Sequence, residues 1–178
     1  MSIDVITRVA AGPFAAACTL LAVAGVSKIR RPVGTRPAAA ALGLPDSRGA
    51  VRALGLAEIA AAGAGIAFGR VAAGVVAALY AALVVAAWRL YRRAPDTPCG
   101  CIGASTAPAS ATHVAVNLAA MIVAVLATAS GSPLSSVGHD AWLRVAFVGL
   151  VGCCAALVVV VIDTLPSLRA AVLEDRTR

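Results

Sequence analysis

The segment 98–103, Pro-Cys-Gly-Cys-Ile-Gly, holds the residues of this 178-residue chain that are best suited to chemistry. Its proline and glycines predict flexible, non-helical backbone around Cys99 and Cys101. An attacking thiolate must be able to reach a disulfide sulfur, so such a loop favours thiol–disulfide exchange. Arg92 and Arg93 lie close by in the sequence and would stabilise a thiolate. A disulfide within so short a loop should be strained and relatively oxidising.

Two other interpretations of this cysteine pair stay open. Thiolates are soft ligands that suit Cu(I), so Cys99 and Cys101 would be the metal ligands of a copper-binding scaffold. No cluster of histidine or methionine accompanies them in the sequence, which favours exchange over metal binding. The second interpretation is that the pair has a purely structural role. The sequence predicts no resident cofactor.

The other three cysteines lie within long apolar segments. Cys18, Cys153 and Cys154 are each about ten residues from a basic segment end, which at about 1.5 Å per residue is near mid-membrane depth. In one interpretation they relay electrons to or from the loop cysteines. Alternatively they are buried fillers, because a free cysteine behaves as a small hydrophobic side chain.

A few polar residues interrupt the apolar segments. Glu58 and Asn117 each lie about two helical turns inside such a segment, and an intramembrane carboxylate is costly enough to suggest function. Ser27 and Lys28 close the preceding apolar segment, and His113 opens the one that holds Asn117. The expected topology gathers these residues with the cysteines at one membrane face, as polar support for their chemistry. The alternatives are a structural Lys28–Glu58 ion pair, an interhelical hydrogen bond from Asn117 and an interfacial His113.

Composition predicts the elements that position these residues. Hydrophobic residues make up 61% of the chain and charged residues 13%, with a mean hydropathy of +0.93, whereas soluble domains are about 45–50% apolar. The apolar residues form blocks of about 20, enough to cross a bilayer. We therefore predict an all-α polytopic membrane helix bundle, a single integral membrane domain over 1–178. Its spans are expected at about 5–27, 51–68, 71–90, 112–129 and 141–162.

Charge placement predicts the orientation. Lys28, Arg30 and Arg31 follow the first block, a stop-transfer pattern that favours a retained span over a cleaved signal peptide. With five spans, twelve of the fifteen Lys and Arg residues fall on one side. The positive-inside rule then predicts a multi-pass plasma-membrane protein with its N-terminus outside and its C-terminus in the cytoplasm.

Several function classes are excluded by what the sequence lacks. Aromatic residues are only 4% of the chain, so its net charge of +7 does not form the aromatic-interleaved basic face of a nucleic-acid binder. The sequence also has no glycine-rich phosphate loop, no His-Glu-x-x-His motif and only two histidines for a Ser-His-Asp set. These absences argue against nucleotide chemistry and classical hydrolase chemistry.

The order of these motifs resembles the methylamine utilisation protein MauE family, which is related to the DoxX-like membrane proteins. The resemblance covers about residues 5–130. It is carried by these residues: Ser27-Lys28-Ile29-Arg30, Leu44-Pro45, Ala57-Glu58, Cys99-Gly100-Cys101-Ile102-Gly103, Pro108, Ser110 and Asn117.

The resemblance implies a redox-associated role in the methylamine metabolic process. Members of that family are associated with maturation of the disulfide-rich small subunit of methylamine dehydrogenase, often with a thioredoxin-fold, TlpA-like partner. We therefore expect Cys99 and Cys101 to exchange electrons with such a partner. A non-enzymatic membrane assembly factor is the competing class, so whether the chain is a thiol–disulfide oxidoreductase component stays open.

The charge count and the resemblance place the cysteine pair differently. The count puts Cys99 and Cys101 at the cytoplasmic face, whereas direct work on extracytoplasmic disulfides would put them outside. Either electrons cross the membrane, as CcdA-like transporters are thought to pass them, or the loop re-enters or the chain is inverted. Three basic residues near the pair favour the cytoplasmic placement.

Overall fold

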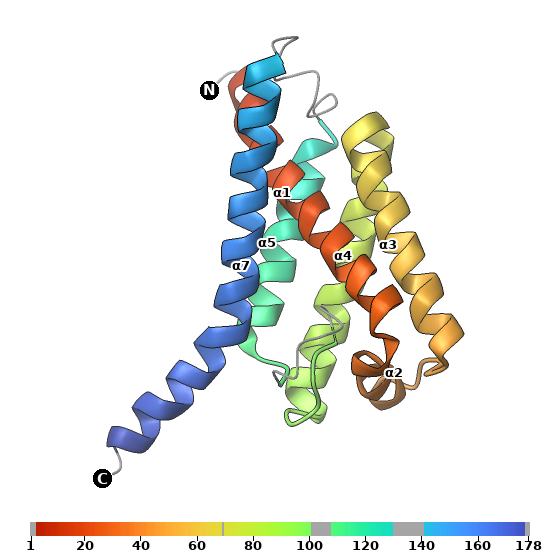
Figure 1. Ribbon diagram of the computed structural model, residues 1–178, viewed down its shortest axis with the longest axis vertical. Coiled ribbons are helices and arrows are strands. Elements are labelled where there is room, and N and C mark those ends of the chain that lie inside the picture. The colour runs from red at the N-terminus through yellow and green to blue at the C-terminus, as the bar shows by residue number, and fades with distance from the viewer. Residues whose placement is uncertain (1–2, 69, 101–107, 130–140, 177–178) are drawn as a thin grey trace.

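The structure is a computed structural model that describes residues 3–68, 70–100, 108–129 and 141–176. Within these residues the chain is all-helical, as the sequence predicts, and a single bridge between Pro98 and Pro108 is the nearest thing to a strand. Figure 1 shows a bundle in which successive long helices alternate in direction. Its helices are α1 (Ile3–Arg30), the 3-10 helix η1 (Pro32–Gly34), α2 (Arg36–Ala41), α3 (Arg48–Phe68), α4 (Arg70–Arg93), α5 (Ala111–Ala127) and α7 (Ala141–Arg176).

Three of these helices contain segments long and apolar enough to cross a membrane. They are Ala11–Arg30, Arg48–Phe68 and Arg70–Arg93. Two shorter apolar helical segments, Ala111–Ala127 and Val145–Val161, overlap the segments expected as the fourth and fifth spans, 112–129 and 141–162. Apolar helices of this kind fit a lipid bilayer, and the protein is a membrane protein of the helical-bundle class.

Helix ends differ in places from the apolar block boundaries. α1 continues through Lys28 to Arg30, and α7 continues beyond residue 162 to Arg176. Hydropathy marks where a segment leaves hydrocarbon, and a helix can continue past that level. The loop after α1 also contains η1 and α2, which hydropathy alone does not predict. At the predicted turn after α3, Arg70 opens α4, and Gly69 lies outside the described residues.

α1 runs through the centre of the bundle and packs against α3, α5 and α7 (Figure 1). Its buried side chains Phe14, Cys18 and Leu21 form the main core with alanines of α3, α4 and α5 and with Val76 and Tyr80 of α4. Tyr80 of α4 donates a hydrogen bond of 2.6 Å to the carbonyl oxygen of Ala17. This bond satisfies a buried hydroxyl and fixes α4 against α1.

The three intramembrane cysteines have different surroundings. Cys18 is fully buried in the main core. Cys153 and Cys154 lie on the exposed surface of α7, so the filler role expected for buried cysteines does not apply to them. Adjacent helical residues point in different directions, and neither of these two points into the core of the bundle.

Candidate functional site

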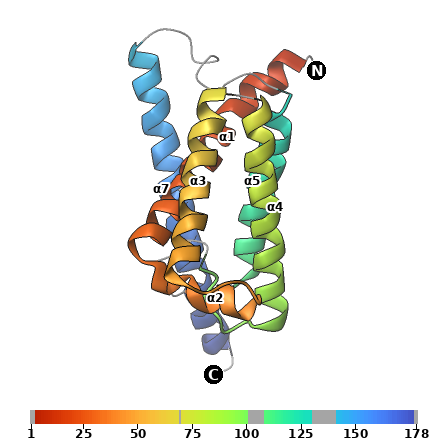
Figure 2. The same cartoon turned by 90° about the vertical axis from the view of Figure 1, so that its right-hand side faces the viewer.

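The ends of four long helices meet at one end of the bundle. α1 and α4 end there, α3 and α5 begin there, and α2 lies across it (Figures 1 and 2). Cys99 and the polar candidates Lys28, Glu58, His113 and Asn117 are on these elements or in the loop after α4. Cys101 falls outside the described residues.

Lys28 and Glu58 form a buried ion pair between α1 and α3. The Lys28 Nζ donates to both carboxylate oxygens of Glu58, at 2.9 Å each, and both side chains are only 1% exposed. In the structure these two residues therefore form the ion pair that was one of the two interpretations of the sequence. A buried pair of this kind contributes little net stability, but removing one partner leaves an uncompensated charge.

Gly25 and Gly55 allow the two helices to approach closely enough for this pair. A Cβ added to Gly25 would lie 2.5 Å from the carbonyl oxygen of Gly55, and one added to Gly55 would lie 2.6 Å from that of Gly25. Each glycine precedes its charged residue by three positions, so glycine and charge share one helix face. This role was not predicted from the sequence. The equal spacing of Gly25–Lys28 and Gly55–Glu58 is the one signal that would have shown it.

We expect Gly25→Ala to destabilise the protein by about 1–3 kcal/mol, because the new Cβ meets backbone that no rotamer change can move. The matched control is Gly63→Ala on α3, where an added Cβ meets nothing within 4 Å. That control should be neutral or slightly stabilising, since alanine favours a helix over glycine. Thermal unfolding of the detergent-purified protein measures both. Equal midpoints for the two variants would contradict a tight Gly25–Gly55 crossing.

Cys99 lies in a loop whose two ends are held together. Pro98 and Pro108 form an antiparallel bridge, and the Ala109 amide donates to the Thr97 carbonyl oxygen at 3.1 Å. The hydroxyl of Thr35, just before α2, donates to the Gly100 carbonyl oxygen at 3.0 Å. The two described ends of the loop, 94–100 and 108–110, are thus held to each other, and Gly100 is held against the start of α2.

The Cys99 side chain is buried, with 6% of its surface exposed, which differs from the exposure expected from the loop composition. It packs in a small apolar cluster with Ala38 of α2, Ala87 and Leu90 of α4, and Ala109. The non-helical backbone around it agrees with the prediction, but tertiary packing covers the thiol. Direct attack on the Cys99 sulfur by another protein would require the loop to move.

Gly100 determines how closely this loop approaches α2. Its φ is +65°, in the left-handed region that favours glycine, and an added Cβ would lie 3.0 Å from the Thr35 Cα. Gly43 also has a positive φ of +71°, but an added Cβ there would meet nothing within 4 Å. Alanine substitutions at the two glycines therefore separate the cost of backbone strain, which both share, from the loss of the close contact with α2, which only Gly100 makes.

We expect Gly100→Ala to displace the loop and to speed alkylation of Cys99 by a maleimide, measured in a chain whose other cysteines are serine. Gly43→Ala should carry a similar backbone cost of about 1–2 kcal/mol while leaving Cys99 protected. The measurement is the alkylation rate of native protein in detergent, followed by mass. Unchanged protection of Cys99 in Gly100→Ala would show that Gly100 does not hold the loop in place.

His113 and Asn117 form a second polar group, at the start of α5. The Ser110 hydroxyl lies 2.9 Å from the His113 Nδ1, and the Asn117 Nδ2 donates to the His113 carbonyl oxygen at 2.7 Å. Both side chains are buried. They begin a stripe of buried residues that continues with Ala120, Ala124 and Ala127, at alternating spacings of four and three. This Asn117 bond lies within its own helix, whereas the sequence suggested a bond between helices.

A family model described as methylamine utilisation protein MauE matches residues 7–130. The chain belongs to the MauE family. The match spans the bundle from α1 to α5 and therefore includes the loop cysteines and the polar candidates, while α7, with Cys153 and Cys154, lies beyond it. Comparisons with curated proteins and with solved structures find no match. The protein is thus a MauE-family membrane protein associated with methylamine utilisation.

The copper hypothesis concerns the Cys99 and Cys101 pair, of which the structure describes only Cys99. Among the described residues, no group of three or more His, Cys, Asp or Glu side chains could hold a metal ion. Cys99 lies among apolar side chains, and Cys101 is not described.

Proposed function

We propose that this MauE protein exchanges electrons between Cys99 and Cys101 and a thioredoxin-fold, TlpA-like partner, in support of extracytoplasmic proteins that contain disulfides. The observation that carries the proposal is the position of Cys99. It lies in a loop braced by Thr35, at the end of the bundle where four helix ends meet. Family membership supports the proposal, because the matched family is named for methylamine utilisation. In that setting the client would be the small subunit of methylamine dehydrogenase.

The proposed reaction is a two-electron exchange. A thiolate of the partner attacks one sulfur of a Cys99–Cys101 disulfide, and the other sulfur leaves as a thiolate. The partner's second thiolate then attacks the mixed disulfide. The partner becomes oxidised and the pair becomes a dithiol, and the reverse sequence passes two electrons to the partner. The relative reduction potentials of the two proteins set the direction.

The burial of Cys99 assigns different roles to the two sulfurs in this proposal. We propose that a reduced partner attacks Cys101 and that the covered Cys99 leaves as the thiolate. In the reverse direction Cys101 attacks the partner's disulfide, and Cys99 then attacks Cys101 in the mixed disulfide and releases the reduced partner. Glu58 and Lys28 would support the site by fixing α1 against α3. Asn117 and His113 would do so by ordering the start of α5 directly after the loop.

Mixed-disulfide trapping tests this assignment. In cells that express the full chain, Cys99→Ser should accumulate a covalent complex with a thioredoxin-fold protein, because the resolving sulfur is missing. Cys101→Ser should trap much less. Mass spectrometry of the reducible complex identifies the partner and the linked cysteine. Absence of a reducible complex with both variants would overturn the exchange proposal.

A non-enzymatic assembly factor is the second candidate function, and the burial of Cys99 is the observation that favours it. In that case the cysteines would hold the loop in shape or bind a partner without turnover. Serine replacements at both positions would then leave maturation of the client intact. The two functions therefore differ in a direct measurement of client disulfide content.

We also propose five membrane spans in the plasma membrane, with the N-terminus outside and the C-terminus in the cytoplasm. α1 begins at one end of the bundle and α7 ends at the opposite end, which agrees with an odd number of crossings (Figure 2). Electrons for an extracytoplasmic client would then have to cross the bilayer. Labelling of Cys99 and Cys101 in intact cells with a membrane-impermeant reagent, before and after reduction, tests this orientation. Labelling without permeabilisation would place the pair outside.

A further inference from the structure

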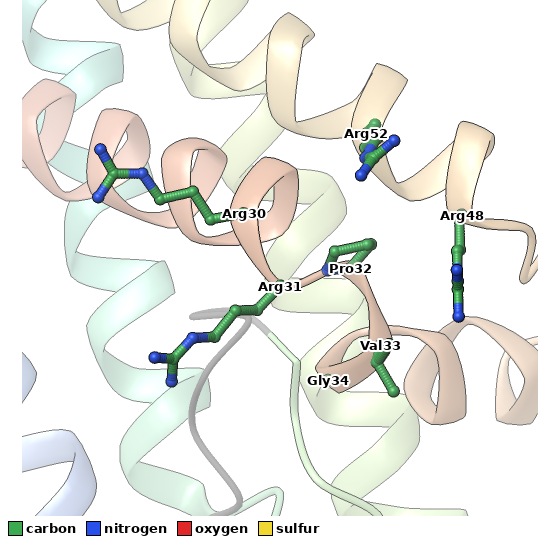
Figure 3. A pocket seen from close by; sticks show the side chains of 7 residues that line it. All are labelled: Arg30, Arg31, Pro32, Val33, Gly34, Arg48 and Arg52. Atoms are coloured by element: carbon green, nitrogen blue, oxygen red, sulfur yellow. The ribbon is translucent and has the colours of Figure 1, made fainter.

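Four arginines line a hollow where α1 ends and α3 begins. Arg30 and Arg31 lie at and just after the end of α1, Arg48 and Arg52 lie on the first turns of α3, and η1 lies between them (Figure 3). The hollow has a volume of about 530 Å³. From these residues we infer that it binds the phosphate headgroup of an anionic phospholipid.

Charge complementarity is the first argument for an anion. The hollow is lined by these four arginines and by Pro32, Val33 and Gly34, without a carboxylate. The nearby carboxylate of Asp46 lies 3.5 Å from the Arg36 Nη2, so it is engaged by a different arginine. Guanidinium groups bind phosphate oxygens through paired N–H donors, and all four arginine side chains are exposed to do so.

Depth in the membrane is the second argument. Two of the apolar segments long enough to span a bilayer are Ala11–Arg30 and Arg48–Phe68, so the hollow lies where both leave the hydrocarbon. Phospholipid phosphates occupy this level. Basic pockets between helices at such a level are suited to anionic headgroups.

The surface beneath the arginines favours a lipid over free phosphate. Val26 precedes Arg30 by four residues and is 38% exposed, and Leu56 follows Arg52 by four residues and is 61% exposed. Residues four apart share one face of a helix, so Arg30 and Arg52 each have an exposed apolar side chain one turn deeper in the span. Acyl chains attached to a headgroup in the hollow would cover this apolar surface, whereas inorganic phosphate would leave it uncovered.

Native mass spectrometry of the full-length protein in detergent tests the inference. Phosphatidylglycerol is titrated against phosphatidylcholine with the same acyl chains, and inorganic phosphate is added in a separate series. The test variant Arg30→Gln/Arg52→Gln removes one charge from each helix. The matched control Arg89→Gln/Arg93→Gln removes two exposed charges from the last turns of α4, at the same end of the bundle.

We expect phosphatidylglycerol to bind in preference to phosphatidylcholine and the test variant to weaken that binding by about 25-fold, since each basic residue near anionic lipid contributes about fivefold. The control should stay close to the unmodified protein. Arg31→Gln/Arg48→Gln should repeat the loss, and it provides a second variant if the first does not fold. Equal losses in test and control variants, or displacement of phosphatidylglycerol by millimolar inorganic phosphate, would overturn the inference.

Discussion

Lys28→Met should lower the free energy of unfolding by about 3–5 kcal/mol, the usual cost of removing one partner from a buried ion pair. The Nζ that donates to both Glu58 oxygens at 2.9 Å is lost, and the carboxylate stays between α1 and α3 with 1% of its surface exposed. Glu58→Gln should cost a similar amount, because it leaves the ammonium group in the same place. Reversible unfolding in mixed micelles measures both.

The double variant Lys28→Met/Glu58→Met separates a structural role from a chemical one. Removing both charges leaves apolar side chains of similar length, so most of the lost stability should return. If the pair only fixes α1 against α3, electron exchange by the cysteines should return as well. A stable double variant that cannot exchange electrons would show that the pair takes part in the chemistry.

Cys99→Ser and Cys101→Ser should each abolish exchange, to the level of the chain without either cysteine. A two-electron exchange within one chain needs both sulfurs, because a lone thiol stops at the mixed disulfide. Client disulfide content in cells and exchange by the purified protein are the two measurements. Normal client maturation in both variants would instead support the assembly-factor function.

The remaining cysteines provide the control for that prediction. Serine replacements at Cys18, Cys153 and Cys154 together should leave exchange between the loop pair and a partner unchanged. Cys18 is enclosed in the main core and the other two are exposed on α7. If electrons cross the membrane through these residues, the triple variant will keep exchange in detergent and lose client maturation in cells.

Hydropathy predicted the helical class because bilayer thickness dictates the length of apolar segments. It did not predict where α7 ends, since the helix continues to Arg176 past its apolar part. α2 was also missed, although Arg-Pro-Ala-Ala-Ala-Ala at 36–41 places proline near a helix start and is followed by strong helix formers.

Less of the candidate site than of the fold could be predicted from the sequence. Lys28 and Glu58 were identified as an ion pair or a chemical group, but their contact depends on the register between α1 and α3. That register is determined where Gly25 meets Gly55, and the chain has sixteen glycines from which to choose. The burial of Cys99 depends on Thr35 and on alanines of α2 and α4, which are distant in sequence.

The most direct test of the central claim is a thiol count on the loop pair. The full chain with serine at positions 18, 153 and 154 is oxidised, mixed with a reduced thioredoxin-fold protein and quenched in acid. Denatured samples are then labelled with a mass-tagged maleimide. We predict that two tags appear on this chain for each partner molecule that becomes oxidised, and that the exchange is reversible. An unchanged tag count during prolonged incubation with an active partner would contradict the proposal that Cys99 and Cys101 act as a redox pair.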